Sequence, residues 1–185
     1  MELQTERLLL RKWRDEDVEL IVRLVEEPNA GKYLTEFSNR EKIYEWIKAE
    51  RDGFERHGYG LFAIERLESA GFIGFCGLVN VGYQAHFTPA VEMYWRIHPD
   101  YWGHGYATEA AAALAAYGFE KLKLNQIVAI AAVENVASRR VMERMGMSHD
   151  PGDDFDHPLK AVGDPLRRQV LYRINPREWH RRRKL

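Results

Sequence analysis

Apolar and polar residues alternate most regularly between Ala90 and Ile97. In an extended conformation, one face of this segment would carry the apolar residues Val91, Met93, Trp95 and Ile97. The opposite face would carry Ala90, Glu92, Tyr94 and Arg96. Because successive side chains of a strand point to opposite faces, the pattern predicts a β-strand whose Glu92 points away from the more apolar side.

Helical and extended patterns alternate after this strand. The alanine-rich stretch Tyr106–Leu122 predicts a helix that packs closely against a sheet. The wholly apolar stretch Ile127–Val133 predicts a central strand that is covered on both faces. Asn135 is placed to cap a further helix, which Gly146 would end in the left-handed conformation.

The flanking segments complete the predicted order of elements. Before Ala90 we expect a strand at Leu3–Trp13, a helix from Asp15 to Pro28, a second helix, and strands at Tyr59–Glu65 and Phe72–Asn80. The second helix would be capped by Asn39 or Ser38 and end near Gly53 or Gly58. A turn-rich acidic loop from Asp150 to Pro165 leads to a last strand at Arg168–Ile174. This order predicts an α/β sheet with helices on both faces, in a single domain spanning residues 1–185.

Composition places the chain among folded globular proteins. It has 185 residues, of which 45% are hydrophobic and 30% charged, enough to bury a substantial core. We find no apolar run of about 18 residues and no secretory signal pattern, so we expect a cytoplasmic protein without a membrane partner. The net charge of −1 disfavours nucleic acid as a partner. The basic end His180–Lys184 is expected to be a solvated terminus.

The cysteine and histidine residues bear on whether the chain has a disulfide or a metal site. Cys76 is the single cysteine, so an intrachain disulfide is excluded, and we expect the side chain in the core. Three histidines lack the spacing of metal ligands, namely His98, His149 and His157. We therefore predict no metal site.

A glycine-rich turn that includes Gly103 and Gly105 precedes the alanine-rich helix. Backbone N–H groups at the start of a helix have no intrahelical partner, so such a turn is suited to bind phosphate. A P-loop is excluded because Tyr106 and Ala107 follow Gly105. A dinucleotide-binding oxidoreductase is disfavoured because Thr108 stands where a third glycine or alanine is expected and the strand-terminal acid comes too late, but this alternative stays open.

The turn and three other segments resemble one enzyme family. Trp102–Ala107 resembles the acyl-CoA pyrophosphate loop of GNAT-type N-acetyltransferases, with Trp102 in place of the usual Gln or Arg. The segment that begins at Asn135–Ser138 is similar to the second cofactor segment of that family. The opening Leu3–Arg11 and the closing Leu171–Trp179 are similar to its ribosomal-protein (RimJ/RimL-like) branch.

This resemblance implies a mixed, centrally splayed sheet of about six to seven strands with helices on both faces. It also implies acetyl-CoA as co-substrate, with the pantetheine arm along the main chain of Tyr94, Trp95 and Ile97. The diphosphate would be bound by the turn residues Gly103, His104, Gly105, Tyr106, Ala107 and Thr108. Further contacts with the cofactor would come from Asn135, Arg139 and Arg140.

Acetyl transfer from a thioester to an amine needs a base, stabilisation of the carbonyl oxygen and protonation of the thiolate. Glu92 is the candidate base, acting through a water, and an ion pair with Arg96 is the structural alternative. Many GNAT-type enzymes protonate the thiolate with a tyrosine, but Met142 occupies that position here and has no proton to donate. The resemblance suggests Ser138 as the substitute, and Tyr172 on the last strand is a further candidate.

The sequence therefore predicts direct transfer of an acetyl group from acetyl-CoA to a primary amine, either a protein N-terminus or a small cationic amine. Besides the oxidoreductase, a CoA-binding regulatory module without catalysis stays open as an alternative. Four carboxylates between Asp150 and Asp156 predict a cationic acceptor, with Asp153 and Asp154 assisting its capture. A homodimer is compatible with these features.

Overall fold

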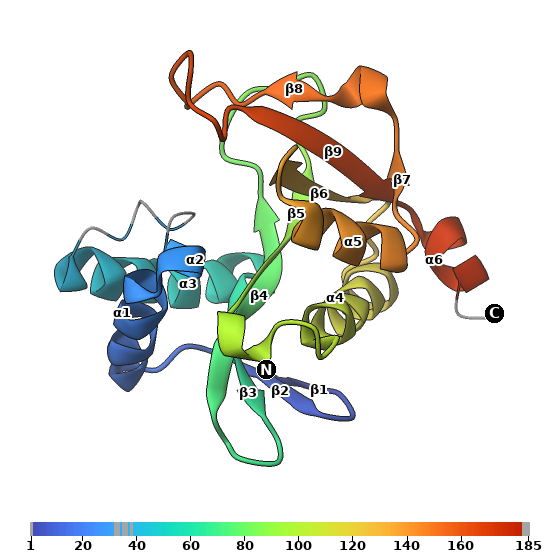
Figure 1. Cartoon of the computed structure of the whole chain (residues 1–185). Helices are drawn as coiled ribbons and strands as arrows, with labels where there is room; N and C mark the ends of the chain where they lie inside the picture. Colours follow the sequence, from blue (N-terminus) through green and yellow to red (C-terminus); the bar gives the residue numbers. More distant parts are fainter. Residues whose placement is uncertain (1, 32–33, 35–36, 38, 183–185) are drawn as a thin grey trace. The chain divides into compact units, whose positions relative to one another are not determined.

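The computed structural model describes residues 2–31, 34, 37 and 39–182 (Figure 1). They form two compact units, one within Met1–Gly77 and Trp95–Ala113, the other within Leu78–Tyr94 and Leu114–Leu185. Strands β4 (Phe72–Asn80) and β5 (Val91–Ile97) and helix α4 (Tyr106–Ala116) each continue from one unit into the other. The bounds of β4 and β5 confirm the strands predicted at Phe72–Asn80 and Ala90–Ile97, with β5 beginning one residue later than predicted.

The first unit is built on antiparallel strands. These are β1 (Glu2–Gln4), β2 (Leu8–Arg11), β3 (Leu61–Arg66) and the first part of β4, paired in this order. The single strand predicted at Leu3–Trp13 is wrong, because a turn separates β1 from β2. Leu8 N–H donates to Thr5 Oγ1 at 2.9 Å, and Thr5 N–H donates to the Leu8 carbonyl at 2.9 Å. Threonine favours such a turn because its hydroxyl competes with strand pairing for backbone groups.

Helices α1 (Val18–Glu26), α2 (Pro28–Gly31) and α3 (Arg40–His57) follow β2. Figure 1 shows them on one side of β3 and β4, with α4 on the other side. Asn39 caps α3 as predicted, since its side chain accepts a hydrogen bond from Lys42 N–H at 2.9 Å. The alternative cap, Ser38, lies outside the described residues. Gly58 ends α3 with a φ of 75°, so Gly53 is an interior residue of the helix.

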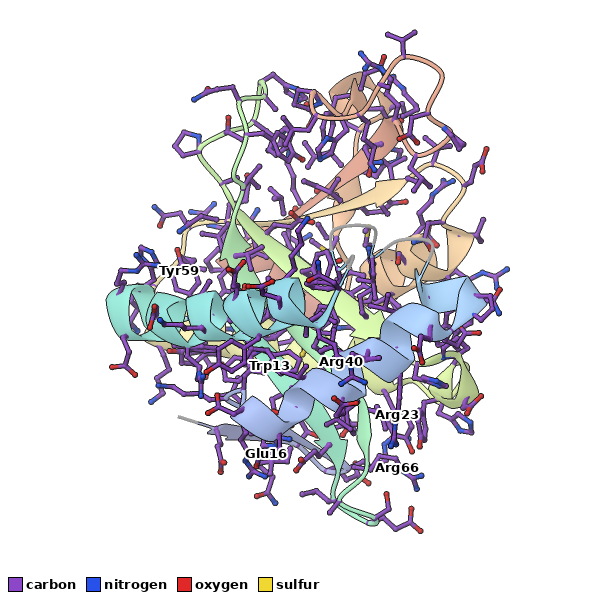
Figure 2. All side chains as sticks on the ribbon, turned by 90° about the vertical axis from the view of Figure 1, so that its left-hand side faces the viewer. Trp13, Glu16, Arg23, Arg40, Tyr59 and Arg66 are labelled. Atoms are coloured by element: carbon purple, nitrogen blue, oxygen red, sulfur yellow. The ribbon has the colours of Figure 1, made fainter. Side chains whose placement is uncertain are left out.

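An aromatic cluster joins α3 to the strands of the first unit. The ring of Trp13 is centred 5.0 Å from that of Trp46 on α3 and 5.9 Å from that of Phe75 on β4. Trp13 lies below α3 in the view of Figure 2, where Arg40 marks the first turn of that helix. The ion pair of Arg40 with Glu19 joins this turn to α1. Aromatic packing and a surface ion pair thus hold the helices of this unit together.

A buried ion-pair network fixes the start of α1 against β2. Arg11 is 3% exposed and donates to the two oxygens of Asp17 at 2.6 and 2.8 Å. It also donates to Glu65 on β3 at 2.7 Å. Asp17 is fully buried and accepts a further hydrogen bond from Arg14 N–H at 2.8 Å. Each charge in this network therefore has a close partner of opposite sign.

The second unit contains the parallel pair of the sheet. β5 runs parallel to β6 (Ile127–Ala132), with Glu92 opposite Val128. β9 (Arg168–Ile174) pairs antiparallel with β6 over six residues and also with the short strands β7 (Ser148–His149) and β8 (Phe155–Asp156). The sheet is therefore mixed, as predicted, and the brief pairing of β5 with β6 agrees with a splayed sheet.

The sheet has nine strands in the described part of the chain, more than the six to seven that were predicted. The first predicted strand is divided into β1 and β2. Two-residue strands, β7 and β8, add to the edge next to β9, and β8 lies inside the segment that was predicted as a loop. Such short pairings carry too few residues to leave an alternating pattern in the sequence.

The alanine-rich helix is shorter than predicted, whereas the helix after β6 ends as predicted. The helix predicted to run to Leu122 ends at Ala116, and a π-helical turn, Tyr117–Lys121, continues it. A Cβ at Gly118 would lie 2.8 Å from Ile127 Cδ1, so β6 packs tightly against this turn. Helix α5 (Val136–Arg144) ends at Gly146, which has the predicted left-handed φ, at 72°.

Helix α6 (Pro176–Arg182) was not predicted. Its Trp179 is 3% exposed, so the helix is anchored in the core of its unit. The basic end is therefore helical as far as Arg182, and Arg183 and Lys184 lie outside the described residues. Cys76 on β4 is fully buried, as predicted, and no helix in the described part of the chain is long and apolar enough to cross a membrane.

We predict that Asp17→Asn destabilises the protein by about 3 kcal/mol, because it leaves the buried Arg11 guanidinium with an incomplete set of anionic partners. Urea unfolding followed by circular dichroism measures the change. Asp15→Asn is the matched control, since Asp15 pairs with Arg51 at 2.5 Å but is 62% exposed. An exposed pair contributes little, so the control should unfold at the wild-type midpoint. Equal loss in both variants would contradict the assigned role of the network.

Candidate cofactor and catalytic sites

The glycine-rich turn takes a conformation that depends on its glycines. A 3₁₀ turn, Pro99–Tyr101, follows β5, and the indole N–H of Trp102 donates to the Ile97 carbonyl at 2.7 Å. Gly103 and Gly105 have φ values of 80° and 82°, in the left-handed region that other residues avoid. The turn then enters α4 at Tyr106, so the first N–H groups of that helix follow directly on the two glycines.

The geometry of the turn fits a bound diphosphate. A Cβ on Gly103 would meet nothing within 4 Å, and one on Gly105 would meet only Arg7 Nη2, at 3.6 Å. The space beside both glycines is therefore open, and Gly103 and His104 are exposed. The hydroxyl of Thr108, in the first turn of α4, is buried and has no hydrogen-bond partner among the described residues. Backbone N–H groups at the start of α4 supply donors that an anion requires, and the contact predicted for Thr108 stays a prediction.

The N-terminal segment holds the turn in place through Glu109. One carboxylate oxygen of Glu109 accepts hydrogen bonds from Thr5 Oγ1 at 2.6 Å and from Arg7 N–H at 2.9 Å. The other accepts from Arg7 Nε at 2.7 Å. The Arg7 guanidinium also donates to the His104 carbonyl at 3.1 Å and lies 4.7 Å from the centre of the Tyr106 ring. We call Thr5, Arg7 and Glu109 the turn clamp.

The turn clamp changes the ionisation of its central carboxyl. Partial burial raises the pKa of Glu109, but the hydrogen bonds from Thr5 and Arg7 outweigh this effect and lower it. The sequence analysis did not identify this function of the three residues. Thr5 and Arg7 lie about a hundred positions before Glu109, and no local pattern indicates such a contact. The similarity of Leu3–Arg11 to one family branch was the available signal.

The predicted pantetheine contacts lie along β5. Trp95 and Ile97 are each 8% exposed, so their side chains belong to the core. The Ile97 carbonyl is bound by Trp102, and the Trp95 carbonyl accepts from Arg96 Nη1 at 3.3 Å. Tyr94 is partly exposed. Contact of this main chain with a pantetheine arm stays a prediction.

The predicted second cofactor segment begins α5 in the second unit. Asn135 Oδ1 accepts a hydrogen bond from Ser138 N–H at 3.1 Å, so the predicted N-cap is confirmed. Ser138 is partly exposed in the first turn. Arg139 folds back, with Nη1 donating to the Val133 carbonyl at 3.2 Å, whereas Arg140 is exposed. The two arginines thus point in different directions, and Arg140 is the one that solvent reaches more freely.

Tyr172 and Met142 are both buried. Tyr172 on β9 is 2% exposed, stacks on His149 with ring centres 4.7 Å apart and donates its hydroxyl to Glu143 at 3.2 Å. Met142 is 1% exposed on the inner face of α5. The proton-donor candidates Tyr172 and Ser138 therefore differ in access to solvent, and Tyr172 already has a carboxylate partner.

Glu92 lies on β5 in the second unit and is partly buried. Its Cα is paired with that of Val128, so both side chains point to the same face of the sheet. Val128 belongs to an apolar cluster with Phe155 and Leu171, and Tyr83 packs against that cluster. Burial, and secondarily the charge of Glu92, raise the pKa of Tyr83. The candidate base is thus placed next to an apolar, aromatic surface.

The acidic residues after α5 are already paired. Asp153 accepts from Arg173 Nε at 2.9 Å and lies 3.2 Å from His86 Nε2, and the hydrogen bond from Arg173 is the main reason that the pKa of Asp153 is lowered. Asp154 lies 2.8 Å from His149 Nε2. Because both carboxylates already have basic partners, a cationic acceptor would have to compete with those partners, and the assistance of Asp153 and Asp154 in its capture stays a prediction.

Comparisons with known proteins agree with this geometry. Residues 7–148 match the family profile of the acetyltransferase (GNAT) domain. An uncharacterized N-acetyltransferase of Bacillus subtilis, YnaD, is 28% identical over 182 residues, which is 97% of this chain and 100% of that protein. The solved structure of a GNAT-family acetyltransferase from Bacillus anthracis is 26% identical, with a TM-score of 0.75 over 95% of this chain and 98% of that one.

The fold likeness extends to the branch that the sequence resembles. The solved structure of RimL, named a ribosomal L7/L12 alpha-N-protein acetyltransferase in complex with coenzyme A, has a TM-score of 0.76 and 16% identity, covering 95% of this chain and 98% of that one. At this identity the likeness concerns the fold alone. The family match spans most of the chain, including the turn and the start of α5. The chain therefore belongs to the GNAT family of acetyl-CoA-dependent N-acetyltransferases.

Proposed function

We propose that this protein transfers the acetyl group of acetyl-CoA directly to a primary amine, either a small amine or a protein N-terminus. The observation that carries the proposal is the open glycine turn at the start of α4, held by the turn clamp. Acetyl-CoA supplies an activated thioester when bound, and Gly103, Gly105 and the first N–H groups of α4 would hold its diphosphate. Family membership disfavours both the oxidoreductase and a module without catalysis.

The burial of Cys76 favours direct transfer over a covalent relay. The thiol is fully buried on β4, and burial raises its pKa, so it stays protonated and out of reach of a substrate. A relay would need an exposed nucleophile with an adjacent base. We infer that the amine itself attacks the thioester, with Glu92 accepting the amine's proton through a water.

The remaining assignments are part of the same proposal. Backbone N–H groups of β5 at Tyr94, Trp95 and Ile97 would lie along the pantetheine arm, and N–H groups there would stabilise negative charge that develops on the carbonyl oxygen. Asn135 and Arg140 would add contacts from α5. We retain a single domain, a cytoplasmic location and the possibility of a homodimer as predictions.

We predict that amine-dependent thiol release depends on Glu92. Glu92→Gln should lower kcat by roughly 10²–10⁴-fold, because an amide cannot accept the proton, and the loss should shrink as the pH rises and the amine becomes neutral. Thiol release from acetyl-CoA measures the rate, and calorimetry checks that acetyl-CoA affinity is retained. Glu134→Gln, at an exposed glutamate, is the control. Acetyl-CoA binding without any turnover would instead favour the regulatory module.

We predict that Gly105→Val lowers acetyl-CoA affinity by at least about tenfold, because a β-branched residue avoids a φ of 82° and would distort the turn. Isothermal titration calorimetry measures the dissociation constant. The fold should persist, since the nearest atom to the new Cβ is 3.6 Å away. Gly53→Ala is the control, because Gly53 lies inside α3 with nothing within 4 Å of a Cβ. Unchanged affinity in Gly105→Val would remove the assigned diphosphate site.

We predict that Glu109→Gln also weakens acetyl-CoA binding, by roughly threefold to tenfold, because it removes the anion that Arg7 binds and leaves the turn less ordered. The variant should also be less stable at neutral pH. The pKa of Glu109 is lowered in the folded protein, so its stabilising effect is present above the ordinary value of 4.5 and is lost as the pH falls through the folded pKa. Thermal unfolding of both proteins should therefore converge in acid; a constant difference would contradict the charge-based role.

A further inference from the structure

The face of the second unit that carries Glu92 is covered by the loop at residues 81–90. Residues opposite one another on paired strands point to the same face, so Glu92 shares its face with Val128. Ile130 lies two residues further along β6 and is paired with Leu171, which extends this face onto β9. Phe155 packs with Val128 and Leu171 in one buried cluster.

The loop places aromatic rings on this cluster. Tyr83 and Phe87 pack against it and are partly exposed. Their ring centres lie 6.3 Å and 5.0 Å from that of Phe155, and 6.5 Å from each other in an edge-to-face arrangement. The ring of His157 also lies next to Tyr83, with ring centres 4.4 Å apart. The rings are therefore held from several sides while part of their surface faces solvent.

The loop itself is well ordered by hydrogen bonds. Val81 N–H donates to the Ala90 carbonyl at 3.0 Å, which closes the base of the loop. Thr88 Oγ1 accepts from Ala85 N–H at 3.0 Å and donates to the Ala85 carbonyl at 2.9 Å. Such a loop presents its aromatic rings without a large loss of conformational freedom on binding.

We propose that Tyr83, Phe87, Phe155 and Glu92, here called the aromatic acceptor patch, bind the amine acceptor, and that this acceptor is a monoamine carrying an aromatic or other apolar group. The inference rests on the proposed acetyl transfer and specifies its substrate class. An ammonium group is attracted to the Glu92 carboxylate and to the face of an aromatic ring. An apolar substituent gains by covering the exposed parts of Tyr83 and Phe87.

The charges around the patch disfavour an acceptor with several amino groups. Asp153 is held between Arg173 and His86, and Arg173 lies opposite Val128 on the same face as Glu92. Asp154 is bound to His149. A second or third ammonium group would therefore meet carboxylates that already bind basic side chains, and it would have to compete with Arg173 for Asp153. Tyr83 remains a neutral hydrogen-bond donor because its pKa is raised.

The test compares phenethylamine with spermidine as acceptors, with acetyl-CoA as donor. We expect kcat/KM for phenethylamine to exceed that for spermidine by at least about tenfold. Tyr83→Ala should raise KM for phenethylamine roughly tenfold and leave the dissociation constant of acetyl-CoA unchanged, whereas Tyr83→Phe should retain most of the affinity. Tyr44→Ala is the control, because Tyr44 is a 47% exposed tyrosine on α3 in the other unit.

Saturation-transfer NMR of phenethylamine with the coenzyme A-bound protein provides a readout independent of turnover. Equal or better acetylation of spermidine, or of a peptide with a free N-terminus, would overturn the aromatic acceptor patch while supporting acetyl transfer. If neither amine is acetylated, the proposed acetyl transfer to small amines is wrong. The NMR signal then tests whether the aromatic acceptor patch binds phenethylamine. Binding that disappears in Tyr83→Ala would support it, and absence of binding to the wild-type protein would overturn it.

Discussion

The hydrogen bonds from Thr5 and Arg7 to Glu109 are the interaction on which the glycine turn, the proposed diphosphate site, depends. Two left-handed glycines give the turn its shape, but glycine also has the largest freedom to lose, so the turn needs external restraint. The turn clamp supplies this restraint. Thr5 and Arg7, in the segment between β1 and β2, bind Glu109 in the first turn of α4, and Arg7 also binds the His104 carbonyl. A site that is ordered before its ligand arrives loses less entropy on binding.

Strand β5 carries the second constraint. Its parallel register with β6 puts Glu92 opposite Val128, and this pairing decides which face the candidate base shares with the aromatic rings of the loop at 81–90. A shift by one residue would turn Glu92 to the opposite face. The same strand ends at Ile97, whose carbonyl binds Trp102 at the entrance to the glycine turn. One strand therefore carries the candidate base and leads into the proposed cofactor turn.

The parts of the fold that sequence predicted are those that depend on local rules. Strand β5 follows from alternation, and the Asn39 and Asn135 caps follow from side-chain hydrogen bonding within one helical turn. Glycine φ values at 103, 105 and 146 follow from steric freedom. The turn at Thr5, the short strands β7 and β8 and the turn clamp depend on partners far along the chain. The contact of Asp153 with Arg173 could not be predicted for the same reason, since the two residues lie 20 positions apart in the chain.

The methionine at position 142 becomes understandable from its burial. Met142 is 1% exposed, so a hydroxyl at this position would need a hydrogen-bond partner within the core of the unit. Protonation of the leaving group is also the least demanding of the three chemical tasks, because a thiolate is a fairly stable anion and a good leaving group. The capped start of α5, with Ser138 partly exposed in its first turn, offers backbone dipoles that favour negative charge. In the proposed mechanism, hydrogen-bond support from such a helix start would assist the thiolate, whereas deprotonation of the amine would depend on Glu92 as the proposed base.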